Sequence, residues 1–351
     1  LAPGDRFAML ARNVLEFPEI EVAAQRAGLI LVPLNYRLTV PELRFIVEDC
    51  GARLLIHGDG YAETAQQLGL PTWHLGDSGL GDPYDEIATS HERLESVPLL
   101  MSTPTRILYT SGTTGRPKGA VLTNRSLWAR AMTFGVDVRI TEHHRFLQTL
   151  PMFHIASNTA LGFTYNGATV ILMDFDAAGT VATLRRHRAT HVLLVPTTIN
   201  MISNLPGIDD QPFPDLEMVL YGASSIAPAV LSRAMDVFDA RFFQFFGMTE
   251  TSGCTILLPE HHDPAGRPDL LASAGVEATG FETRIVGPDD VDLPAGEVGE
   301  ILCRGPHLMA GYWNRPDATA EALRNGWMHT GDAGFRTEEG FLFVTDRIKD
   351  M

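Results

Sequence analysis

The sequence predicts an α/β fold with two αβ subdomains, each built on a parallel sheet, and a small β-rich lobe. Two observations support this prediction. Apolar segments of strand length alternate with amphipathic segments of helix length over most of the chain. From about residue 275 onward, short strands and turns replace that alternation. Because the apolar strands lack a clean two-residue alternation, we expect helices to cover both faces of the sheets.

The first elements follow this rhythm from the N-terminus. Strands are expected at 6–11, 29–35 and 53–57, and helices at 17–28 and 39–51. Gly28 and Gly51 stand where the two helices should end, and Thr39 is a candidate N-cap. Residues 61–105 have weak periodicity and many turn formers, so we expect a surface connection there.

The alternation resumes after residue 105. Strands are expected at 106–110, 119–123, 168–173, 190–196 and 216–222, and helices at 124–135 and 228–238. Short strands are expected within 281–289, 298–305 and 340–346. The domain bounds that follow are 1–105 and 106–274 for the αβ subdomains and 275–346 for the β-rich lobe.

Composition excludes several classes of protein. The formal net charge of -16 argues against a general nucleic-acid binder, because such a surface repels phosphates at long range. No apolar run approaches the ~20 residues that a membrane-spanning helix needs. Cys50, Cys254 and Cys303 lie far apart, which favours reduced thiols and a cytoplasmic location. The histidine pairs at 143–144 and 261–262 lack metal-site spacing and are expected in surface loops.

The stretch YTSGTTGRPKGAVLT, residues 109–123, combines glycines and hydroxyl side chains with one lysine. Free backbone N–H groups in a glycine-rich turn form an anion-binding nest, and Ser and Thr hydroxyls add donors. Lys118 is one of only two lysines in the chain, and the compact ammonium suits a position beside a ligand. The stretch is not a Walker loop, because Pro117 precedes the lysine and a strand follows it. A polyphosphate site and a plain connecting turn both remain open on these residues alone.

This stretch resembles the phosphate-loop signature of the adenylate-forming enzymes, which include acyl-CoA synthetases, aryl-CoA ligases, luciferases and peptide-synthetase adenylation domains. Further stretches agree with the family in order and spacing: LPMFHIAS (150–157), YGASSIAP (221–228), QFFGMTETSG (244–253), WMHTGDAG (327–334) and DRIKDM (346–351). The resemblance implies two stacked αβ subdomains plus the β-rich lobe, in a large adenylation domain over 1–346 with a hinge at 347–351.

The resemblance also implies roles for individual residues. The β- and γ-phosphates of ATP would be held by Thr110, Ser111, Gly112, Thr113, Thr114, Gly115 and Lys118. Adenine and the rest of the nucleotide would be held by Gly222, Ala223, Ser224, Gln244, Phe245, Phe246 and Gly247. Phe246 stands where the family more often has Tyr. The phenylalanine ring keeps the face that can stack on adenine but lacks the tyrosine hydroxyl. Thr249 would contact the α-phosphate, and Asp332 and Arg347 would bind the ribose region.

Magnesium would bind Glu250 and Thr110, because Mg²⁺ prefers hard oxygen ligands and needs few from the protein when phosphates are present. The acyl pocket would be lined by His154, Asn158, Tyr221, Gly222, Gly247 and Met248. These residues offer no cation for a second carboxylate, which favours a fatty or aromatic monocarboxylic acid. Two interpretations of His154 remain: a histidine buried in the core, or a residue that gates the acyl tunnel.

The implied reaction is ATP-dependent formation of an acyl-adenylate, followed by thioester formation with coenzyme A. A ligase that loads a carrier protein and a non-catalytic nucleotide-binding relative are the alternatives. Lys349 falls at the position of the family hinge, after which a small C-terminal domain with a catalytic lysine is expected. Without that domain, we expect the 351 residues to bind nucleotide and acid but to adenylate poorly. A homodimer and peripheral association with a membrane are left open.

Overall fold

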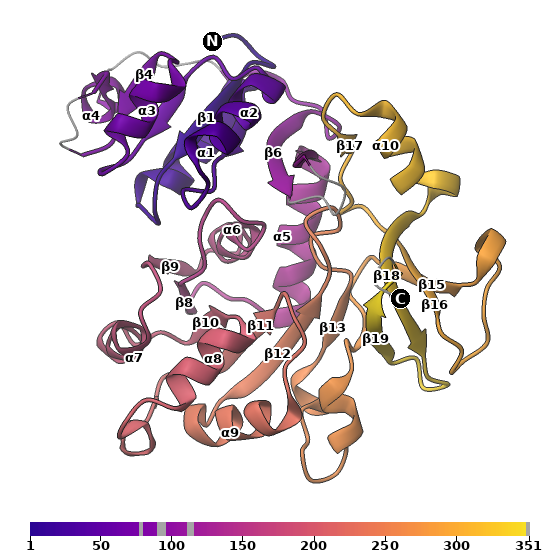
Figure 1. Cartoon of the computed structure of the whole chain (residues 1–351). Coiled ribbons are helices and arrows are strands. Elements are labelled where there is room, and N and C mark those ends of the chain that lie inside the picture. The colour runs from indigo at the N-terminus through magenta and orange to yellow at the C-terminus, as the bar shows by residue number, and fades with distance from the viewer. Residues whose placement is uncertain (77–79, 90–95, 111–115, 349–351) are drawn as a thin grey trace. The chain divides into compact units, whose positions relative to one another are not determined.

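The structure is a computed structural model that describes residues 1–76, 80–89, 96–110 and 116–348. By internal contacts the chain forms two compact units (Figure 1). The first unit comprises 1–128, 151–157 and 309–319, and the second comprises 129–150, 158–308 and 320–351. These units do not by themselves test the domain bounds predicted from the sequence.

The first unit contains a sheet in which eight described strands follow the order β17-β7-β6-β2-β1-β3-β4-β5. Its strands are β1 (Arg6–Leu10), β2 (Ile30–Pro33), β3 (Leu55–His57), β4 (Thr72–His74), β5 (Asp82–Pro83), β6 (Pro104–Thr110), β7 (Lys118–Thr123) and β17 (Gly311–Tyr312). From β6 to β5 the neighbours are parallel, whereas β7 is antiparallel to both β6 and β17. The helices are α1 (Glu16–Ala27), α2 (Val40–Cys50), α3 (Ala62–Leu68) and α4 (Tyr84–Ala88).

Local sequence accounts for the first two helices. Gly28 and Gly51 follow them in the left-handed conformation, with φ of 70° and 62°, where glycine avoids a Cβ clash. Thr39 and Glu42 form a capping box at the start of α2, in which Glu42 Oε2 accepts from the Thr39 N–H at 2.7 Å. All four residues of β2 are buried, as expected for a strand covered on both faces.

A buried ion pair anchors β6. The guanidinium of Arg106 pairs with the carboxylate of Glu21 on α1, and both side chains are at most 2% exposed. Arg106 Nη1 also donates to Ser157 Oγ at 2.7 Å. This strand leads directly into the glycine-rich stretch, so the ion pair fixes the base of that stretch against α1.

The second unit contains a sheet of seven described strands in the order β14-β13-β12-β11-β10-β8-β9. The strands are β8 (Arg145–Gln148), β9 (Thr169–Leu172), β10 (His191–Leu194), β11 (Met218–Gly222), β12 (Arg241–Phe246), β13 (Thr255–Leu257) and β14 (Val276–Glu277). Those from β9 to β12 are parallel, and β13 and β14 are antiparallel additions. Its helices are α6 (Ser157–Tyr165), α7 (Ala177–Arg186), α8 (Pro196–Ser203) and α9 (Pro228–Phe238), with α5 (Asn124–Val138) shared between the units.

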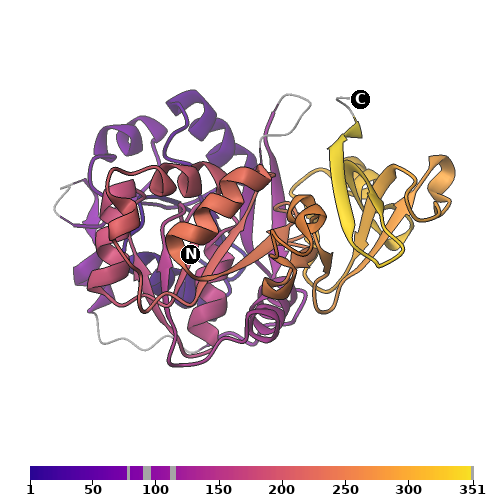
Figure 2. The same ribbon diagram turned by 90° about the horizontal axis from the view of Figure 1, so that it is seen from below.

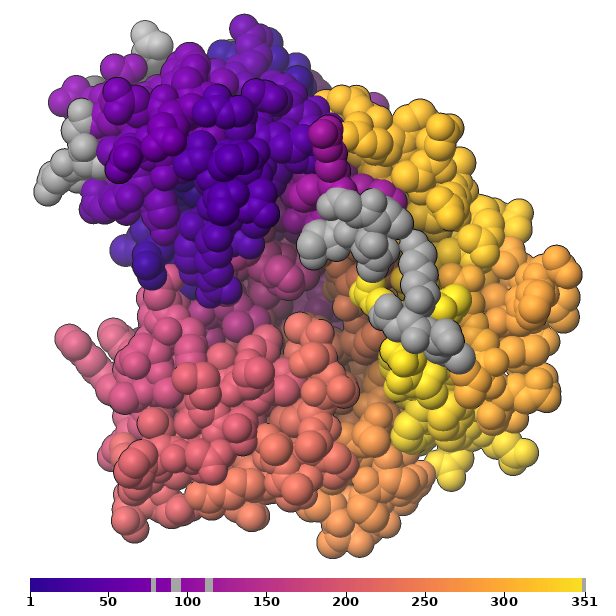
Figure 3. Space-filling model, in the orientation of Figure 1, coloured from indigo at the N-terminus to yellow at the C-terminus, as the bar shows by residue number. Residues whose placement is uncertain are grey.

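The same unit contains an antiparallel four-stranded sheet in the order β15-β16-β18-β19 (Figure 2). Its strands are β15 (Glu282–Val286), β16 (Gly299–Arg304), β18 (Met328–Arg336) and β19 (Leu342–Arg347). The short helix α10 (Pro316–Ala322) precedes β18, and 3-10 turns lie at 208–210, 259–261, 268–272, 288–290 and 324–326. The orange and yellow surface in Figure 3 includes this sheet and its loops.

The structure confirms the α/β class, the parallel sheets and the change to short strands after residue 275. The three cysteines are free and buried, as predicted. The expectation of a surface connection at 61–105 is wrong, since these residues contain α3, α4 and the edge strands β4 and β5. The sequence does not reveal them because short elements at a sheet edge carry little periodicity. Among the described residues, no helix is both long and apolar enough to span a bilayer.

Candidate functional site

In the first unit, β6 and β7 form the stem of the glycine-rich stretch. Thr110 and Lys118 face each other in the ladder, and Thr110 Oγ1 donates to the Lys118 carbonyl oxygen at 3.4 Å. Gly119 sits where an added Cβ would lie 2.6 Å from Ile107 Cγ2, so the close approach of the strands requires glycine. The stem therefore holds Thr110 and Lys118, on either side of the glycine-rich residues, next to each other. Five predicted phosphate-site residues lie outside the described residues: Ser111, Gly112, Thr113, Thr114 and Gly115.

The ammonium of Lys118 lies over an aromatic ring. Its Nζ is 5.1 Å from the ring centroid of Tyr312, a residue that β17 brings beside Ala120 of β7. Such a cation–π contact is worth about 0.5–1 kcal/mol at an exposed site. The contact favours a position of the ammonium beside the ring, and a polyphosphate would compete with the ring for it.

The residue before the turn is also anchored. The Tyr109 hydroxyl donates to Asp49 Oδ2 at 2.7 Å, and Arg315 Nη2 donates to Asp49 Oδ1 at 2.5 Å. Burial and the bond to the carboxylate raise the pKa of Tyr109, which therefore stays a neutral donor. The sequence alone could not reveal this network, because its three residues lie far apart along the chain.

In the second unit, the carboxyl ends of β11 and β12 lie side by side. The register pairs Gly222 with Phe245, and a Cβ on Gly222 would be 2.4 Å from the Phe245 carbonyl oxygen. Ala223 follows in the left-handed region with φ of 72°, and Ser224 is exposed. A non-glycine residue in this region is strained, and such strain often marks a functional turn. Open α/β sheets bind ligands at this edge of the sheet.

Phe245 and Phe246 point to opposite sides of β12, as neighbours in a strand must. Phe246 is half-buried and packs against a cluster of Ala274, Ile285, Ile301 and Leu342, which leaves part of its ring accessible for stacking. Phe245 faces α5, where its ring contacts Phe134 at 6.1 Å between centroids. Both rings are half-buried, and the assignment of Phe246 as the residue that stacks on a base stays a prediction.

Tyr221 and Gln244 belong to a buried network. The Tyr221 hydroxyl donates to Gln244 Oε1 at 3.2 Å and lies 2.9 Å from His262 Nε2. Tyr221 is fully buried in the hydrophobic core of the second unit, so its predicted place in the lining of an acyl pocket is not seen here. The expectation that His262 lies in a surface loop is wrong, because this network draws the imidazole into the core.

The loop after β12 folds tightly on itself. The Met248 N–H donates to Thr251 Oγ1 at 3.0 Å, and a Cβ on Gly247 would lie 2.5 Å from Gly253 Cα. Thr249 is half-buried in this loop, and Glu250 is 4% exposed. The described residues contain no group of three or more acidic, His or Cys side chains arranged to hold a metal ion. A buried carboxylate in a constrained loop fits Mg²⁺ only if substrate phosphates and water supply most of its ligands.

Asp332 lies on β18 opposite Arg347 of β19. Arg347 Nε is 3.1 Å from Asp332 Oδ1. Burial raises the pKa of Asp332, and Arg347 partly offsets that effect. The pair gives the predicted ribose site one acceptor and one donor on adjacent strands. Lys349, the predicted hinge residue, lies outside the described residues.

Two residues predicted for the acyl pocket are close in the sequence but belong to different units. His154 is exposed, and its Nδ1 accepts from the Ala156 N–H at 3.4 Å. Asn158 is 4% exposed near the start of α6. His154 belongs to the first unit and Asn158 to the second, so each is placed only within its own unit.

Sequence reasoning missed Arg130, whose guanidinium is buried on α5. It lies 4.4 Å from the ring centroid of Phe134 and 5.5 Å from that of Phe245. Burial lowers the pKa of Arg130 to about 10, so the side chain stays charged at neutral pH. The spacing of Arg130 and Phe134, four residues apart on a predicted helix, was the one local signal for this contact.

Comparisons with known proteins agree with this geometry. Residues 1–313 match the family described as AMP-binding enzyme. The fatty acid–[acyl-carrier-protein] ligase ScoC of Streptomyces coeruleorubidus is 36% identical over 362 residues, which cover 100% of this chain and 69% of the relative. The feruloyl-CoA synthase of an Amycolatopsis species is 36% identical over 352 residues, which cover 99% of this chain and 70% of the relative. The inhibitor-bound N-terminal domain of FACL13 from Mycobacterium tuberculosis superposes with a TM-score of 0.90 at 30% identity. The superposition covers 99% of this chain and 87% of that structure.

Proposed function

This chain belongs to the family of AMP-binding enzymes and is an AMP-forming acid–thiol ligase, and we propose that it activates a hydrophobic monocarboxylic acid. The observation that carries the proposal is the edge of the second unit's sheet. There the Gly222–Ser224 turn, the half-buried ring of Phe246 and the loop with Thr249 and Glu250 follow two adjacent parallel strands.

Each group has a role in the proposed reaction. Phe246 stacks on adenine, while Asp332 accepts hydrogen bonds from the ribose hydroxyls. Lys118 and Thr110, with the residues of the turn between them, bind the β- and γ-phosphates. An oxygen of the acid's carboxylate attacks the α-phosphorus and the bond to the bridging oxygen breaks, so that pyrophosphate leaves and an acyl-adenylate remains. The protein contributes position and charge stabilisation, and no covalent step of its own.

The residues of the second unit also fit a divalent cation. Glu250 would hold Mg²⁺, with Thr110 as a further proposed ligand, and the ion would neutralise charge on the phosphate oxygens. Thr249 donates from its hydroxyl to an oxygen of the α-phosphate. Charge that develops there in the transition state is then met by donors that are already in place.

The nature of the acid follows from the pocket candidates. His154, Asn158 and Met248 are apolar or neutral polar side chains, and none carries a fixed positive charge for a second carboxylate. Relatives named for fatty acids and for ferulic acid support the same class of acid. The substrate is therefore a fatty or aryl monocarboxylic acid.

Coenzyme A is the proposed thiol acceptor, as in the relatives named CoA ligases and synthases. An acyl carrier protein is the second candidate, because a relative of equal identity is named for that acceptor. Release of AMP from the loaded enzyme distinguishes them when coenzyme A and a phosphopantetheinyl carrier are added separately. A homodimer and a cytoplasmic location stay predictions from the sequence.

Acid-dependent exchange of pyrophosphate into ATP tests the proposal in the full-length protein. The acid panel contains saturated fatty acids, cinnamic acids and benzoic acids, with dicarboxylic acids of matched length as controls. We expect exchange with one of the hydrophobic monocarboxylic classes and little with the dicarboxylic acids. Absence of exchange with every acid, in a protein that still binds ATP, would favour a non-catalytic nucleotide-binding relative.

A further inference from the structure

The segment Thr330–Gly331–Asp332 forms a bulge in β18. In the ladder with β16, Glu300 faces Ala333 and Leu302 faces His329. One residue of β16, Ile301, therefore stands opposite the three residues of the bulge. Gly331 has φ of 72°, in the left-handed region that favours glycine. A bulge re-aims the side chains next to it, and here that side chain is Asp332.

Side chains replace the ladder bonds that the bulge interrupts. The Gly331 N–H donates to Glu300 Oε1 at 3.2 Å. The Asp332 N–H donates to Thr330 Oγ1 at 3.1 Å, and that hydroxyl donates to the Ile301 carbonyl oxygen at 2.7 Å. Two backbone donors of the bulge are thus satisfied by side chains, since the regular strand partner cannot reach them.

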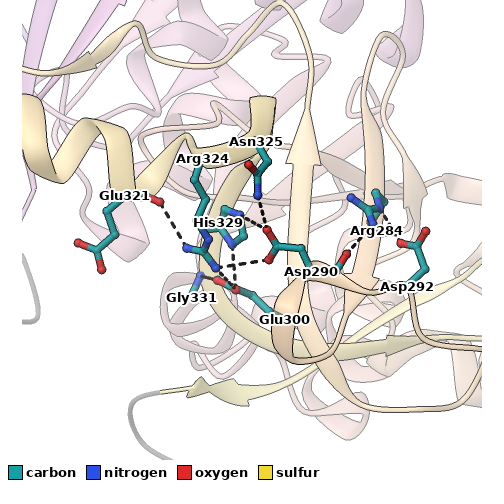
Figure 4. Close-up of polar contacts among 9 residues, drawn as sticks. All are labelled: Arg284, Asp290, Asp292, Glu300, Glu321, Arg324, Asn325, His329 and Gly331. Atoms are coloured by element: carbon teal, nitrogen blue, oxygen red, sulfur yellow. Dashed lines mark hydrogen bonds and ion pairs between the residues drawn. The ribbon is translucent and has the colours of Figure 1, made fainter.

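Glu300 is itself held in place (Figure 4). Its Oε2 lies 3.0 Å from His329 Nδ1 and 3.4 Å from Arg324 Nη2. His329 Nε2 is 3.8 Å from Asp290 Oδ2, an oxygen that also accepts from Asn325 Nδ2 at 2.8 Å. The Glu300 side chain is 18% exposed and that of His329 is 4% exposed. Contacts from several directions therefore fix the carboxylate that receives the Gly331 N–H.

We propose that Glu300 is a positioning residue for Asp332, and this inference rests on the proposed function, in which Asp332 binds the ribose hydroxyls. By accepting from the Gly331 N–H, Glu300 keeps the bulge in the form that directs Asp332 toward the nucleotide. Without that acceptor the ladder can relax, and a one-residue shift in a strand turns its side chains to the opposite face. Glu300 then acts on nucleotide recognition without touching the ligand.

Selectivity for the ribose hydroxyls is the readout that a merely structural role would not change. The dissociation constants of ATP, 2′-deoxy-ATP and 3′-deoxy-ATP are measured by calorimetry on the full-length protein. A hydrogen bond to a charged group predicts that the wild type binds ATP at least about tenfold more tightly than the deoxy analogues. In Glu300→Ala we expect this preference to fall to within about twofold. Glu300→Gln keeps an amide oxygen for the Gly331 N–H and is expected to retain most of the preference.

Asp292→Ala is the matched control on the same lobe. It removes an acidic side chain that lies outside the bulge and pairs with Arg284 at 2.6 Å (Figure 4). Its ATP preference should equal that of the wild type. If Glu300→Ala does not fold, as judged by circular dichroism, Glu300→Met keeps the volume, removes both acceptors and takes its place.

Asp332→Ala separates failure of this inference from failure of the proposed function. If Asp332→Ala abolishes the preference while the Glu300 variant keeps it, the positioning role is wrong and the ribose assignment stands. If Asp332→Ala itself keeps the full preference for ATP, Asp332 does not bind the ribose, and the inference about Glu300 fails with that assignment.

Discussion

Replacing Lys118 by alanine should weaken ATP binding by an amount that its contacts allow us to bound. A hydrogen bond between an ammonium and a phosphate is worth about 1.5–3 kcal/mol. In the free protein the ammonium already lies 5.1 Å from the Tyr312 ring centroid, a contact worth about 0.5–1 kcal/mol that binding must offset. The net loss is then about 0.5–2.5 kcal/mol, which corresponds to roughly a 2- to 70-fold increase in the dissociation constant.

The same stretch contains a matched control. Arg116 is also a cation beside the turn, but its guanidinium lies 5.4 Å from the ring centroid of Phe45. Calorimetry should show that Arg116→Ala changes ATP affinity by less than about twofold, while thermal unfolding confirms that both variants fold. The assignment of Lys118 to the phosphates would be refuted if Lys118→Ala bound ATP as tightly as the wild type. It would also be refuted if Arg116→Ala lost as much ATP affinity as Lys118→Ala. A Tyr312→Leu variant refines the reasoning, because loss of the ring should leave ATP binding unchanged or slightly tighter.

Three further predictions concern other parts of the molecule. Glu250→Gln should raise the magnesium concentration needed for half-maximal pyrophosphate exchange, and an unchanged metal titration would count against the assigned role. Burial raises the pKa of Asp332 in the folded protein above its value in the unfolded chain. At a pH above the folded-state pKa the ionised carboxylate therefore lowers the free energy of unfolding, and this loss disappears as the pH falls below that pKa. Asp332→Asn should therefore unfold at a higher temperature than the wild type at pH 7 while binding ATP more weakly; a lower unfolding temperature contradicts this sign. Glu21→Ala leaves Arg106 charged and buried without its carboxylate partner. Urea unfolding should show that the free energy of unfolding of the first unit falls by about 3–5 kcal/mol. Glu21→Leu combined with Arg106→Met should recover most of that loss, and a double variant as unstable as the single one would show that the pair is not the cause.

The sequence predicted those features that depend on neighbouring residues. Gly28 and Gly51 end helices in the left-handed conformation as expected, because helix termination is a local property of the backbone. The strand before YGASS was likewise predicted, and it forms β11. Local patterns were sufficient for these elements, because an amphipathic segment of 11 or 12 residues indicates a helix and a continuous apolar run bounded by turn formers indicates a buried strand.

Features that depend on distant residues were not predictable. Tyr312 reaches Lys118 only because β17 adds to the edge of β7, and a two-residue strand has no periodicity. In the sequence, Glu300 is one acidic residue in an expected strand. Only the register of β16 against β18 shows that it lies beside a bulge. His262 was misplaced for the same reason, since its partner Tyr221 lies 41 residues away. The side chains that hold the site in place are therefore the part that sequence patterns miss.

The first unit is discontinuous, since it comprises 1–128, 151–157 and 309–319. During synthesis on the ribosome, the strand that completes its sheet emerges only after most of the second unit has been made. Until then the outer edge of β7 lacks its partner and can pair with other chains. Translation that stalls before residue 309 should thus release nascent chains that aggregate through the very hairpin that carries Lys118.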